Sequence, residues 1–371
     1  MREALALAAE AIGLSDPNPR VGCVLIAADG REIGRGYTQA AGGPHAEVMA
    51  LRDALHAGQA TRGSTAVVTL EPCAHHGRTP PCCDALIAAD VARVVVASID
   101  PFAQVAGQGV ARLRTAGIEV LVLPPGELTD AAHELNIGFF SRVTRGRPWV
   151  RLKAAVSLDG RSALANGASR WITGDAARRD GHVWRKRAGA VLTGVGTVID
   201  DDPRLDVRFV ESARQPLRVV VDSRLRTPPA ARLLDLPGSA LILAADASLR
   251  GGEAHIALHA RGAEVAFLAP SPDGAVDLRA VLAELAARGV NELHVEAGER
   301  LNGALVRERL LDEYLVYMAP CLLGDGRGLA AFGPLSSLNE AQTLRFVSVT
   351  PVGDDIRIVA RPAATAAAMA D

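Results

Sequence analysis

Residues 42–48, GGPHAEV, and residues 70–82, LEPCAHHGRTPPC, decide the fold and the chemistry of the first part of this chain. In the first stretch, His45 and Glu47 stand two positions apart, a spacing that points side chains to nearly opposite sides of a continuous helix. Both can face one metal only if the helix begins there. The two glycines and Pro44 supply such a beginning, because proline is favoured in the first turn of a helix.

The second stretch supplies two sulfur ligands. We expect a strand that ends at Leu70 and delivers Cys73, and a second helix that begins at Cys82, directly after Pro81. Helix N-termini favour thiolates. Together with His45, the two cysteines make three protein ligands and leave the fourth tetrahedral position of a zinc ion open for water, which is typical of a catalytic zinc site.

Glu47 is the candidate acid and base of this site. Zinc lowers the pKa of its bound water toward neutrality, and a nearby carboxylate can take the water's proton and pass it to a ring nitrogen and to leaving ammonia. The pattern therefore predicts hydrolytic deamination of a heteroaromatic amine. Two other interpretations stay open: a chance HAE triplet, and a non-catalytic zinc module in which His75 or Cys83 provides a fourth ligand.

The order of HAE, EPC and PPC matches the zinc nucleobase deaminases, with one departure. Those enzymes carry a close C-x-x-C pair, whereas eight residues separate Cys73 from Cys82 here. An alternative function is therefore a nucleobase or tRNA-type zinc deaminase with an inactive accessory domain. A formal net charge of -2 and an aromatic content of 4% count against nucleic acid as the partner.

The stretches PNPRVGCVL, HAEVMAL and EPCAHHGRTPPC resemble the deaminase half of the bifunctional deaminase and reductase family of bacterial riboflavin biosynthesis. The resemblance covers most of residues 1–145 and implies a cytidine-deaminase-like α/β/α sandwich in which Glu47 shuttles protons. It also implies zinc ligands and substrate-binding residues, which are His45, Cys73 and Cys82 for zinc, and Asn18, His76 and Arg78 for the substrate. The family pattern DPNPLVAGKG is replaced here at Phe102, Ala103 and Gln108.

The length and the pattern of apolar runs predict two domains. A chain of 371 residues exceeds what one hydrophobic core usually supports. Apolar runs such as VGCVLIA, TAVVTL and RVVVAS alternate with helical patterns, which is typical of an α/β sandwich, and the basic segment SRVTRGRP resembles a connector. We expect a deaminase domain at residues 1–143, a second α/β domain at 147–362 and a disordered tail at 363–371.

Three further expectations concern local structure. Val48, Leu51 and Leu55 fall on one side of the helix expected after Glu47, which predicts its apolar face. One helix is expected near residues 128–140. Strands near residues 344–350 and 355–360 predict a late hairpin that differs from a simple doubly wound sheet.

The cysteines and the N-terminus favour a cytoplasmic protein. Cys73, Cys82 and Cys83 lie within eleven residues, which suits metal binding in a reducing compartment better than a disulfide framework. The opening sequence MREALALAAEAIGL lacks the apolar region of a secretory signal, and no run of about 18 apolar residues suggests a membrane span. We expect no membrane and no nucleic-acid partner.

In the second half, four features suggest a cofactor site, and each also has a plainer explanation. Lys153 lies in the largely apolar strand WVRLKAAVS and either meets an anionic partner or points to water. The turn GVG allows close backbone approach, although GxG alone is a weak signal. Ser223 and Arg224 can hold a 2′-phosphate or form a surface turn. The helix expected after Gly298 can bind a pyrophosphate or simply follow an ordinary turn.

The stretches KAAVSLDG, SRWIT, TGVGTVIDDDPRL, VVVDS and VEAG occur in the order found in the reductase half of the same family, over about residues 146–360. The resemblance implies a dihydrofolate-reductase-like α/β domain that uses NADPH. The residues implied to line NADPH are Ala155, Trp171, Thr197, Asp201, Ser223, Gly298, Glu299, Arg300, Leu301, Asn302, Gly303 and Ala304. Those implied to hold the substrate are Ser169, Arg185, Leu205, Arg208 and Glu296.

The combined interpretation is a bifunctional enzyme of riboflavin biosynthesis. Its first domain would deaminate 2,5-diamino-6-ribosylamino-4(3H)-pyrimidinone 5′-phosphate, and its second would reduce the ribosyl group to ribityl by hydride transfer. Lys153 and Asp201 are the candidates for acid assistance, and the arginines suit the sugar phosphate because arginine binds phosphate bidentately. The carboxylate of Glu299 would be unfavourable beside a pyrophosphate unless it points away. From the family we also expect a homo-oligomer, a dimer or tetramer, formed through the reductase domain.

Overall fold

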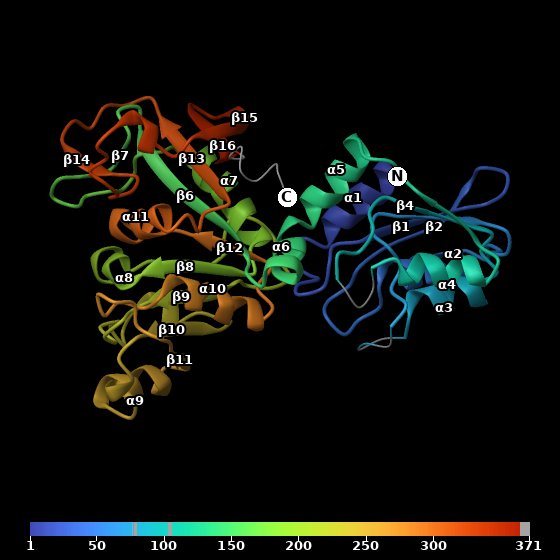
Figure 1. The fold of residues 1–371 in the computed structure, drawn as a ribbon, viewed down its shortest axis with the longest axis horizontal. Coiled ribbons are helices and arrows are strands. Elements are labelled where there is room, and N and C mark those ends of the chain that lie inside the picture. The colour runs from blue at the N-terminus through green and yellow to red at the C-terminus, as the bar shows by residue number, and fades with distance from the viewer. Residues whose placement is uncertain (76, 78–79, 103–105, 364–371) are drawn as a thin grey trace. The chain divides into compact units, whose positions relative to one another are not determined.

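The computed structural model describes residues 1–75, 77, 80–102 and 106–363. Its contacts divide the chain into two compact units, unit 1 (Met1–Arg147) and unit 2 (Pro148–Asp371). Each unit is a β-sheet with helices against it (Figure 1), so the α/β class predicted from the sequence is confirmed. The expected tail, from residue 364 onward, lies outside the described residues.

Unit 1 contains a five-stranded sheet with the order β2-β1-β3-β4-β5. Strand β1 pairs antiparallel with β2 and β3, and β3, β4 and β5 run parallel. The elements are α1 (Arg2–Glu10), β1 (Gly22–Ile26), β2 (Glu32–Tyr37), α2 (Ala46–His56), β3 (Thr65–Val68), α3 (Cys82–Ala88), β4 (Arg93–Val96), α4 (Gln108–Thr115), β5 (Glu119–Val122), α5 (Glu127–Leu135) and α6 (Ile137–Arg145).

Small residues bring α2 close to the sheet. A Cβ atom on Gly36 of β2 would lie 2.5 Å from the backbone nitrogen of Ala50, so the strand admits only glycine there. Ala50 is fully buried, whereas Leu55 is 73% exposed. The predicted apolar face is therefore wrong at Leu55, whereas Leu51 is partly buried and packs against the core of the unit. The helix turns its alanines to the sheet, because this close approach leaves no room for a larger side chain.

The single helix expected near residues 128–140 is two helices, α5 and α6, with Asn136 between them. The buried Asn136 side chain accepts a hydrogen bond from the backbone N–H of Arg20 at 2.7 Å and donates one to the Arg20 carbonyl at 2.9 Å. This two-way pairing with a distant backbone segment accompanies the break. The prediction missed it because the partner lies more than a hundred residues away in the sequence.

Unit 2 contains a nine-stranded sheet with the order β11-β10-β9-β8-β12-β6-β13-β16-β15 and a small pair β14-β7. The strands from β11 to β13 run parallel. The elements are β6 (Trp149–Ser157), β7 (Arg161–Leu164), α7 (Asp175–Arg187), β8 (Ala190–Gly194), α8 (Val195–Asp201), β9 (Leu217–Val221), β10 (Ala240–Ala244), α9 (Glu253–Ala260), β11 (Ala263–Phe267), α10 (Leu278–Ala287), β12 (Glu292–Val295), α11 (Glu299–Arg307), β13 (Glu313–Ala319), β14 (Gly326–Gly328), β15 (Leu344–Val352) and β16 (Asp355–Pro362).

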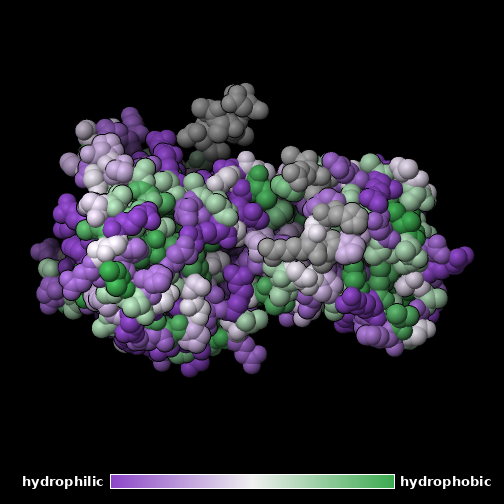
Figure 2. All heavy atoms as spheres, turned by 90° about the horizontal axis from the view of Figure 1, so that it is seen from below, coloured by the Kyte–Doolittle hydropathy of each residue, from purple (hydrophilic) through white to green (hydrophobic). Residues whose placement is uncertain are grey.

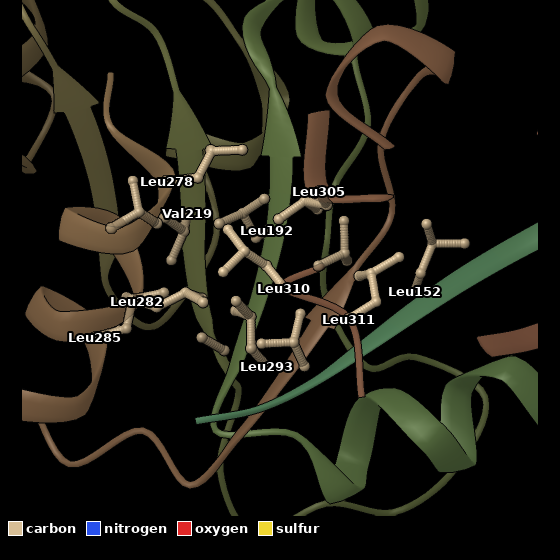
Figure 3. Close-up of a cluster of buried hydrophobic side chains, with 14 of the residues drawn as sticks. Leu152, Leu192, Val219, Leu278, Leu282, Leu285, Leu293, Leu305, Leu310 and Leu311 are labelled. Atoms are coloured by element: carbon tan, nitrogen blue, oxygen red, sulfur yellow. The ribbon is translucent and has the colours of Figure 1, made fainter. Parts of the chain in front are cut away.

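The alternation of side chains along the parallel strands assigns helices to the two faces of this sheet. On one face Leu192 and Val219 pack with the leucines of α10 and α11 (Figure 3). On the other face their neighbours Val191 and Val220 pack with apolar residues of α8 and α9. The central strands are thus buried on both sides, which explains why they are almost uniformly apolar.

The chain returns at the end of unit 2 through an antiparallel hairpin. Strand β16 pairs antiparallel with β13 and with β15, which is the last strand of the sheet. The predicted late hairpin is therefore confirmed. It replaces the parallel edge that a simple doubly wound sheet would have.

None of the helices in the described ranges is both long and apolar enough to cross a membrane. On the face shown in Figure 2, hydrophobic residues form small groups among hydrophilic ones.

Two candidate active sites

In unit 1 the ends of two helices and a loop bring three metal-binding side chains together. His45 caps the start of α2, Cys82 opens α3 after Pro81, and Cys73 lies in the loop after β3. The His45 Nδ1 atom lies 3.3 Å from Cys82 Sγ and 3.7 Å from Cys73 Sγ. All three ligand atoms lie within 4.8 Å of one another.

These three residues fit a zinc ion. Two tetrahedral ligands at the usual Zn–N and Zn–S lengths would stand about 3.5 Å apart, close to both His45 distances. The backbone N–H of Cys82 donates to Cys73 Sγ at 3.3 Å. Hydrogen bonding from Cys82, and then the nearby His45, lowers the pKa of Cys73 to about 4, so its sulfur is the thiolate that binds metal.

Glu47 lies beside this group in a small cavity of about 50 Å³, which His45, Cys73, Asn18 and Thr38 also line. The side chain of Glu47 is almost fully buried, and desolvation together with the neighbouring Cys73 raises its pKa. A buried carboxylate that shares a cavity with metal ligands is suited to hold and move a proton. Asn18, which the resemblance implies for the substrate, lines the same cavity.

The sequence left a fourth ligand open, and the structure turns Cys83 away from the metal group. Its Sγ lies 3.3 Å from the Pro72 carbonyl and 3.6 Å from the Gly109 carbonyl, and donates to these oxygens. Desolvation raises the pKa of Cys83 to about 12, so it stays a neutral thiol. Within the described residues, the metal group contains His45, Cys73 and Cys82 alone. His76 and Arg78 lie outside the described residues.

Two buried carboxylates near the zinc group were not singled out from the sequence. Glu71 accepts backbone hydrogen bonds from Asp100, Gly107 and Val110 at 3.0–3.2 Å and so fastens the loop after β4 to the site. Asp100 lines the cavity, and desolvation raises its pKa to about 6. The sequence signal that could have identified Glu71 is its position directly after the apolar run that ends at Leu70. Of the unusual loop residues, Phe102 contacts the ring of His75, and Ala103 lies outside the described residues.

Unit 2 contains a much larger cavity, of about 800 Å³, at the carboxyl ends of its parallel strands. This edge is where open α/β sheets bind their ligands. The residues expected for NADPH that line it are Ala155, Trp171, Thr197, Asp201, Gly298, Glu299, Arg300, Leu301 and Asn302. The substrate residues that line it are Ser169, Leu205 and Glu296, together with the candidate acid Lys153.

Lys153 lies within electrostatic reach of the Glu296 carboxylate, although among the described residues the two groups form no ion pair. The half-buried side chain lines the cavity near Glu296 and the ring of Tyr317. Desolvation lowers the pKa of Lys153, the Glu296 carboxylate acts in the opposite direction, and the positive charge of Arg185 reinforces the lowering. A lysine in such surroundings gives up its proton more readily than one in water.

Arg185 binds Glu296 and does not line the cavity. Its Nε and Nη2 atoms donate to the two carboxylate oxygens of Glu296 at 2.5 and 2.8 Å, and its Nη1 donates to the Asp206 carbonyl at 2.8 Å. Arg185 and its electrostatic neighbours hold the pKa of Glu296 well below its usual range. The arginine therefore positions a permanently charged carboxylate at the cavity wall.

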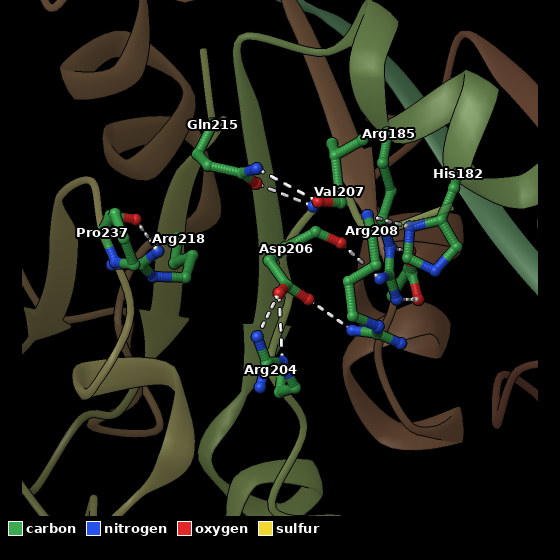
Figure 4. Close-up of polar contacts among 10 residues, drawn as sticks. His182, Arg185, Arg204, Asp206, Val207, Arg208, Gln215, Arg218 and Pro237 are labelled. Carbon is green, nitrogen blue, oxygen red and sulfur yellow. Dashed lines mark hydrogen bonds and ion pairs between the residues drawn. The ribbon is translucent and has the colours of Figure 1, made fainter. Parts of the chain in front are cut away.

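Arg208 belongs to a cluster behind the cavity (Figure 4). The buried Asp206 carboxylate accepts hydrogen bonds from both Arg204 and Arg208. The backbone N–H of Arg208 donates to His182 Nδ1 at 3.2 Å, and burial, followed by the nearby arginine charges, lowers the pKa of His182 to about 4. Arg208 is thus held in place, although its guanidinium does not line the cavity.

Three residues expected to line NADPH do not line the cavity either: Ser223, Gly303 and Ala304. The Ser223 hydroxyl accepts a hydrogen bond from the backbone of Val276 at 3.1 Å. A Cβ on Gly303 would lie 1.9 Å from the Ala331 carbonyl oxygen, so this glycine serves the packing of α11.

The carboxylate of Glu299 is turned toward protein groups. Its Oε2 accepts a hydrogen bond from the Gly328 N–H at 3.1 Å. The electrostatic objection to a carboxylate beside a pyrophosphate is thereby reduced. The cavity also includes Arg178, Arg226 and Arg327, which sequence reasoning missed because they come from loops and elements without a recognisable motif.

Both units match known protein families. The family model described as "Cytidine and deoxycytidylate deaminase zinc-binding region" matches residues 1–98, and the one described as "RibD C-terminal domain" matches residues 148–358. The riboflavin biosynthesis protein RibD of Escherichia coli (strain K12) is 44% identical over 369 residues, 96% of each chain. RibD of Aquifex aeolicus is 40% identical over 358 residues, also 96% of each chain.

Solved structures agree over almost the full length. A structure of RibD from Acinetobacter baumannii has a TM-score of 0.87 at 40% identity and covers 98% of each chain. The diaminohydroxyphosphoribosylaminopyrimidine deaminase/5-amino-6-(5-phosphoribosylamino)uracil reductase of Thermotoga maritima has a TM-score of 0.83 at 32% identity, with 98% of this chain and 97% of that chain covered. The predicted cytidine-deaminase-like and dihydrofolate-reductase-like folds are confirmed. The chain therefore belongs to the RibD family of riboflavin biosynthesis, enzymes that join a zinc-dependent deaminase to an NADPH-dependent reductase.

Proposed function

We propose that unit 1 deaminates 2,5-diamino-6-ribosylamino-4(3H)-pyrimidinone 5′-phosphate and that unit 2 reduces the ribosyl group of the product to ribityl. The observation that carries the proposal is the pairing, in one chain, of the His45–Cys73–Cys82 group beside Glu47 with a large cavity at the edge of a reductase sheet. The name of the Thermotoga maritima relative combines the same two activities.

In the deaminase site, His45, Cys73 and Cys82 hold zinc, which when bound supplies a water acidified toward neutrality. Glu47 accepts a proton from this side of the cavity and delivers it to the ring nitrogen and to the leaving ammonia. Asn18 lines the same cavity and orients the pyrimidine by its amide. His76 and Arg78, outside the described residues, stay predictions as substrate-binding residues.

In the reductase site, NADPH when bound would supply the hydride that reduces C1′ of the ribosyl group. Lys153 donates a proton to the substrate oxygen, a role that its lowered pKa favours. Glu296, fixed by Arg185, binds substrate hydroxyl groups as a hydrogen-bond acceptor. Asp201 lies near Ser169, whose hydroxyl donates to it at 3.4 Å, and this pair stays the second candidate for proton transfer.

The substrate phosphate is assigned to the side of the cavity that contains Ser169 and Leu205. Arg208 is the proposed cation, held ready by Asp206, and it would have to turn from this carboxylate toward the phosphate. Arg185 contributes through Glu296, since both of its terminal contacts are already made.

The test is a paired assay on the wild type and on Glu47→Gln. Ammonia release from the diaminopyrimidine is followed without NADPH, and NADPH oxidation is then followed on substrate that has already been deaminated. We expect the substitution to lower ammonia release by about 10²- to 10⁴-fold and to leave NADPH oxidation unchanged. Unchanged ammonia release in Glu47→Gln would contradict the assigned role, and no ammonia release from zinc-loaded wild type would contradict the deaminase substrate.

We also propose a homo-oligomer formed through unit 2. What supports it is the last strand of the sheet, β15, where Phe346, Val347 and Val349 are 43–71% exposed. Exposed apolar edge strands are suited to pairing with another copy. Light scattering after size exclusion should give a dimer or tetramer for the wild type and a smaller species for Phe346→Asp; a monomeric wild type would contradict the proposal. The cluster of unoxidised cysteines at the zinc site supports the expected cytoplasmic compartment.

A further inference from the structure

Five arginines line the reductase cavity, and they differ in whether their charge is already used. Arg170, Arg178 and Arg327 form ion pairs with Asp201, Asp175 and Asp200. The guanidinium groups of Arg226 and Arg300 make no ion pair or hydrogen bond with any residue that the structure describes. Two cations without partners, on the wall of one cavity, leave a positive charge that an anionic ligand can neutralise.

Arg226 lies in the loop after β9, at the end of the cavity away from Lys153. Lys153 lies on β6, and Val221, which also lines the cavity, ends β9 just before the Arg226 loop. In the sheet order β9-β8-β12-β6 these strands are three spacings apart, about 14 Å. A dinucleotide with its nicotinamide near Lys153 therefore carries its adenosine toward β9.

Arg226 is held at this edge by a braced loop. The buried Asp222 carboxylate accepts hydrogen bonds from the Thr227 N–H at 2.6 Å and the Thr227 hydroxyl at 2.7 Å, which closes the segment between them. Leu225 lies in the core of the unit with a φ of 50°. The fixed bend turns Arg226 to the cavity, whereas Arg224, on the other side of Leu225, does not line it.

We propose that Arg226 recognises the 2′-phosphate of NADPH and so makes the reductase select NADPH over NADH. The inference rests on the proposed NADPH site and adds its specificity-determining residue. Arginine is suited to this task because its planar guanidinium binds a phosphate through two parallel hydrogen bonds. The sequence had pointed to Ser223 and Arg224, three and two positions too early; the loop geometry moves the assignment to Arg226.

A phosphate monoester also occurs on the substrate, so the test must separate the two sources. Calorimetric titration of the full-length chain with 2′,5′-ADP and with 5′-AMP isolates the 2′-phosphate, and ribose 5-phosphate serves as the probe for the substrate phosphate. The variants are Arg226→Ala, Arg226→Lys and Arg224→Ala, which removes another exposed arginine from the same loop. Binding of each probe is measured directly, without turnover.

We expect the wild type to bind 2′,5′-ADP at least about tenfold more tightly than 5′-AMP. Arg226→Ala should abolish most of this preference without weakening 5′-AMP, Arg226→Lys should retain part of it, and Arg224→Ala should match the wild type. Ribose 5-phosphate should not compete with 2′,5′-ADP. Steady-state kinetics should show the same pattern as a rise in KM for NADPH but not for NADH.

Several results would overturn the inference. An unchanged preference in Arg226→Ala, or its loss in Arg224→Ala, would assign the 2′-phosphate elsewhere, and competition by ribose 5-phosphate would assign Arg226 to the substrate. If the wild type binds NADPH and NADH equally well, the 2′-phosphate is not recognised, and the inference is contradicted although the cofactor site itself is not. A wild type that binds neither nucleotide would contradict the proposed NADPH site itself, and the inference with it.

Discussion

The zinc site and the reductase cavity are built in opposite ways. The zinc group and Glu47 come from residues 45–82 and lie at a cavity of about 50 Å³, with two donors at the starts of helices and the third, Cys73, in a loop. The reductase cavity, about 800 Å³, collects residues from Lys153 to Leu329 along the edge of a nine-stranded sheet. A metal ion is bound by a few donor atoms at fixed distances, whereas a dinucleotide needs an extended binding surface. The zinc site can therefore be recognised from short sequence motifs, whereas the reductase cavity depends on the order of the strands in the sheet.

The largest effect is expected from a substitution that disrupts the zinc site and leaves the reductase cavity intact. Cys82→Ser removes one of the three ligands, so zinc content measured by mass spectrometry should fall from one per chain to nearly none, and ammonia release by at least about 10³-fold. NADPH oxidation on deaminated substrate should not change.

Cys83→Ser is the matched control, because this neighbouring thiol faces the carbonyls of Pro72 and Gly109. Zinc content and ammonia release should stay close to those of the wild type. If Cys83→Ser loses zinc as Cys82→Ser does, the three-ligand assignment is wrong.

The next largest effect is expected in unit 2, at the ion pair between Arg185 and Glu296 beside the reductase cavity. Arg185→Met leaves the buried Glu296 without its guanidinium and should lower the free energy of unfolding of unit 2 by about 3 kcal/mol. Urea unfolding followed by tryptophan fluorescence measures it, because Trp149, Trp171 and Trp184 are all in unit 2. Arg261→Met, which breaks an exposed pair with Asp235, should cost less than about 0.5 kcal/mol. Equal costs for the two variants would argue against a buried, coupled pair.

A pH effect is expected from His182 in the cluster behind the cavity. Its pKa is lowered to about 4, so the unfolded chain takes up a proton below pH 6.5 while the folded chain does not. The stability of unit 2 should therefore decline as the pH falls from 6.5 to 4, and His182 should account for up to about 3 kcal/mol of the decline. His182→Asn keeps an acceptor for the Arg208 N–H but cannot titrate. The tryptophan signal of this variant should show a flatter pH profile; identical profiles would contradict the prediction.

The smallest effect sharpens the comparison at the helix that begins beside the zinc ligand. Leu55→Ala, at a position 73% exposed, should change the free energy of unfolding of unit 1 by less than about 0.5 kcal/mol. Ala50→Leu, at the contact with Gly36, should cost about 1–3 kcal/mol because the helix cannot move closer to or away from the strand freely. Calorimetric unfolding of the two variants measures both. A larger loss in Leu55→Ala would mean that this leucine is buried after all.

The sequence by itself determined the two-part α/β organisation, the late hairpin and the three donors of the zinc group. These follow from short-range rules: helices that begin just after Pro44 and Pro81, short apolar runs that alternate with helical patterns, and ligand types with the right spacing. The resemblance to the riboflavin family extended this to NADPH and to a set of residues, of which many line the cavity and Arg185, Arg208 and Ser223 do not.

Only the tertiary structure decided which groups are free to bind. Arg185 and Arg208 resemble phosphate ligands in the sequence, yet carboxylates 111 and two positions away already occupy them, while Arg226, without any motif, stays unpaired. Likewise, helical spacing predicts Leu55 as a core residue, yet α2 turns its alanines to the sheet and leaves Leu55 73% exposed. The physical reason is common to both cases: which charges pair and which side of a helix is packed depend on the three-dimensional arrangement, even where the partner is as near in the sequence as Asp206 is to Arg208.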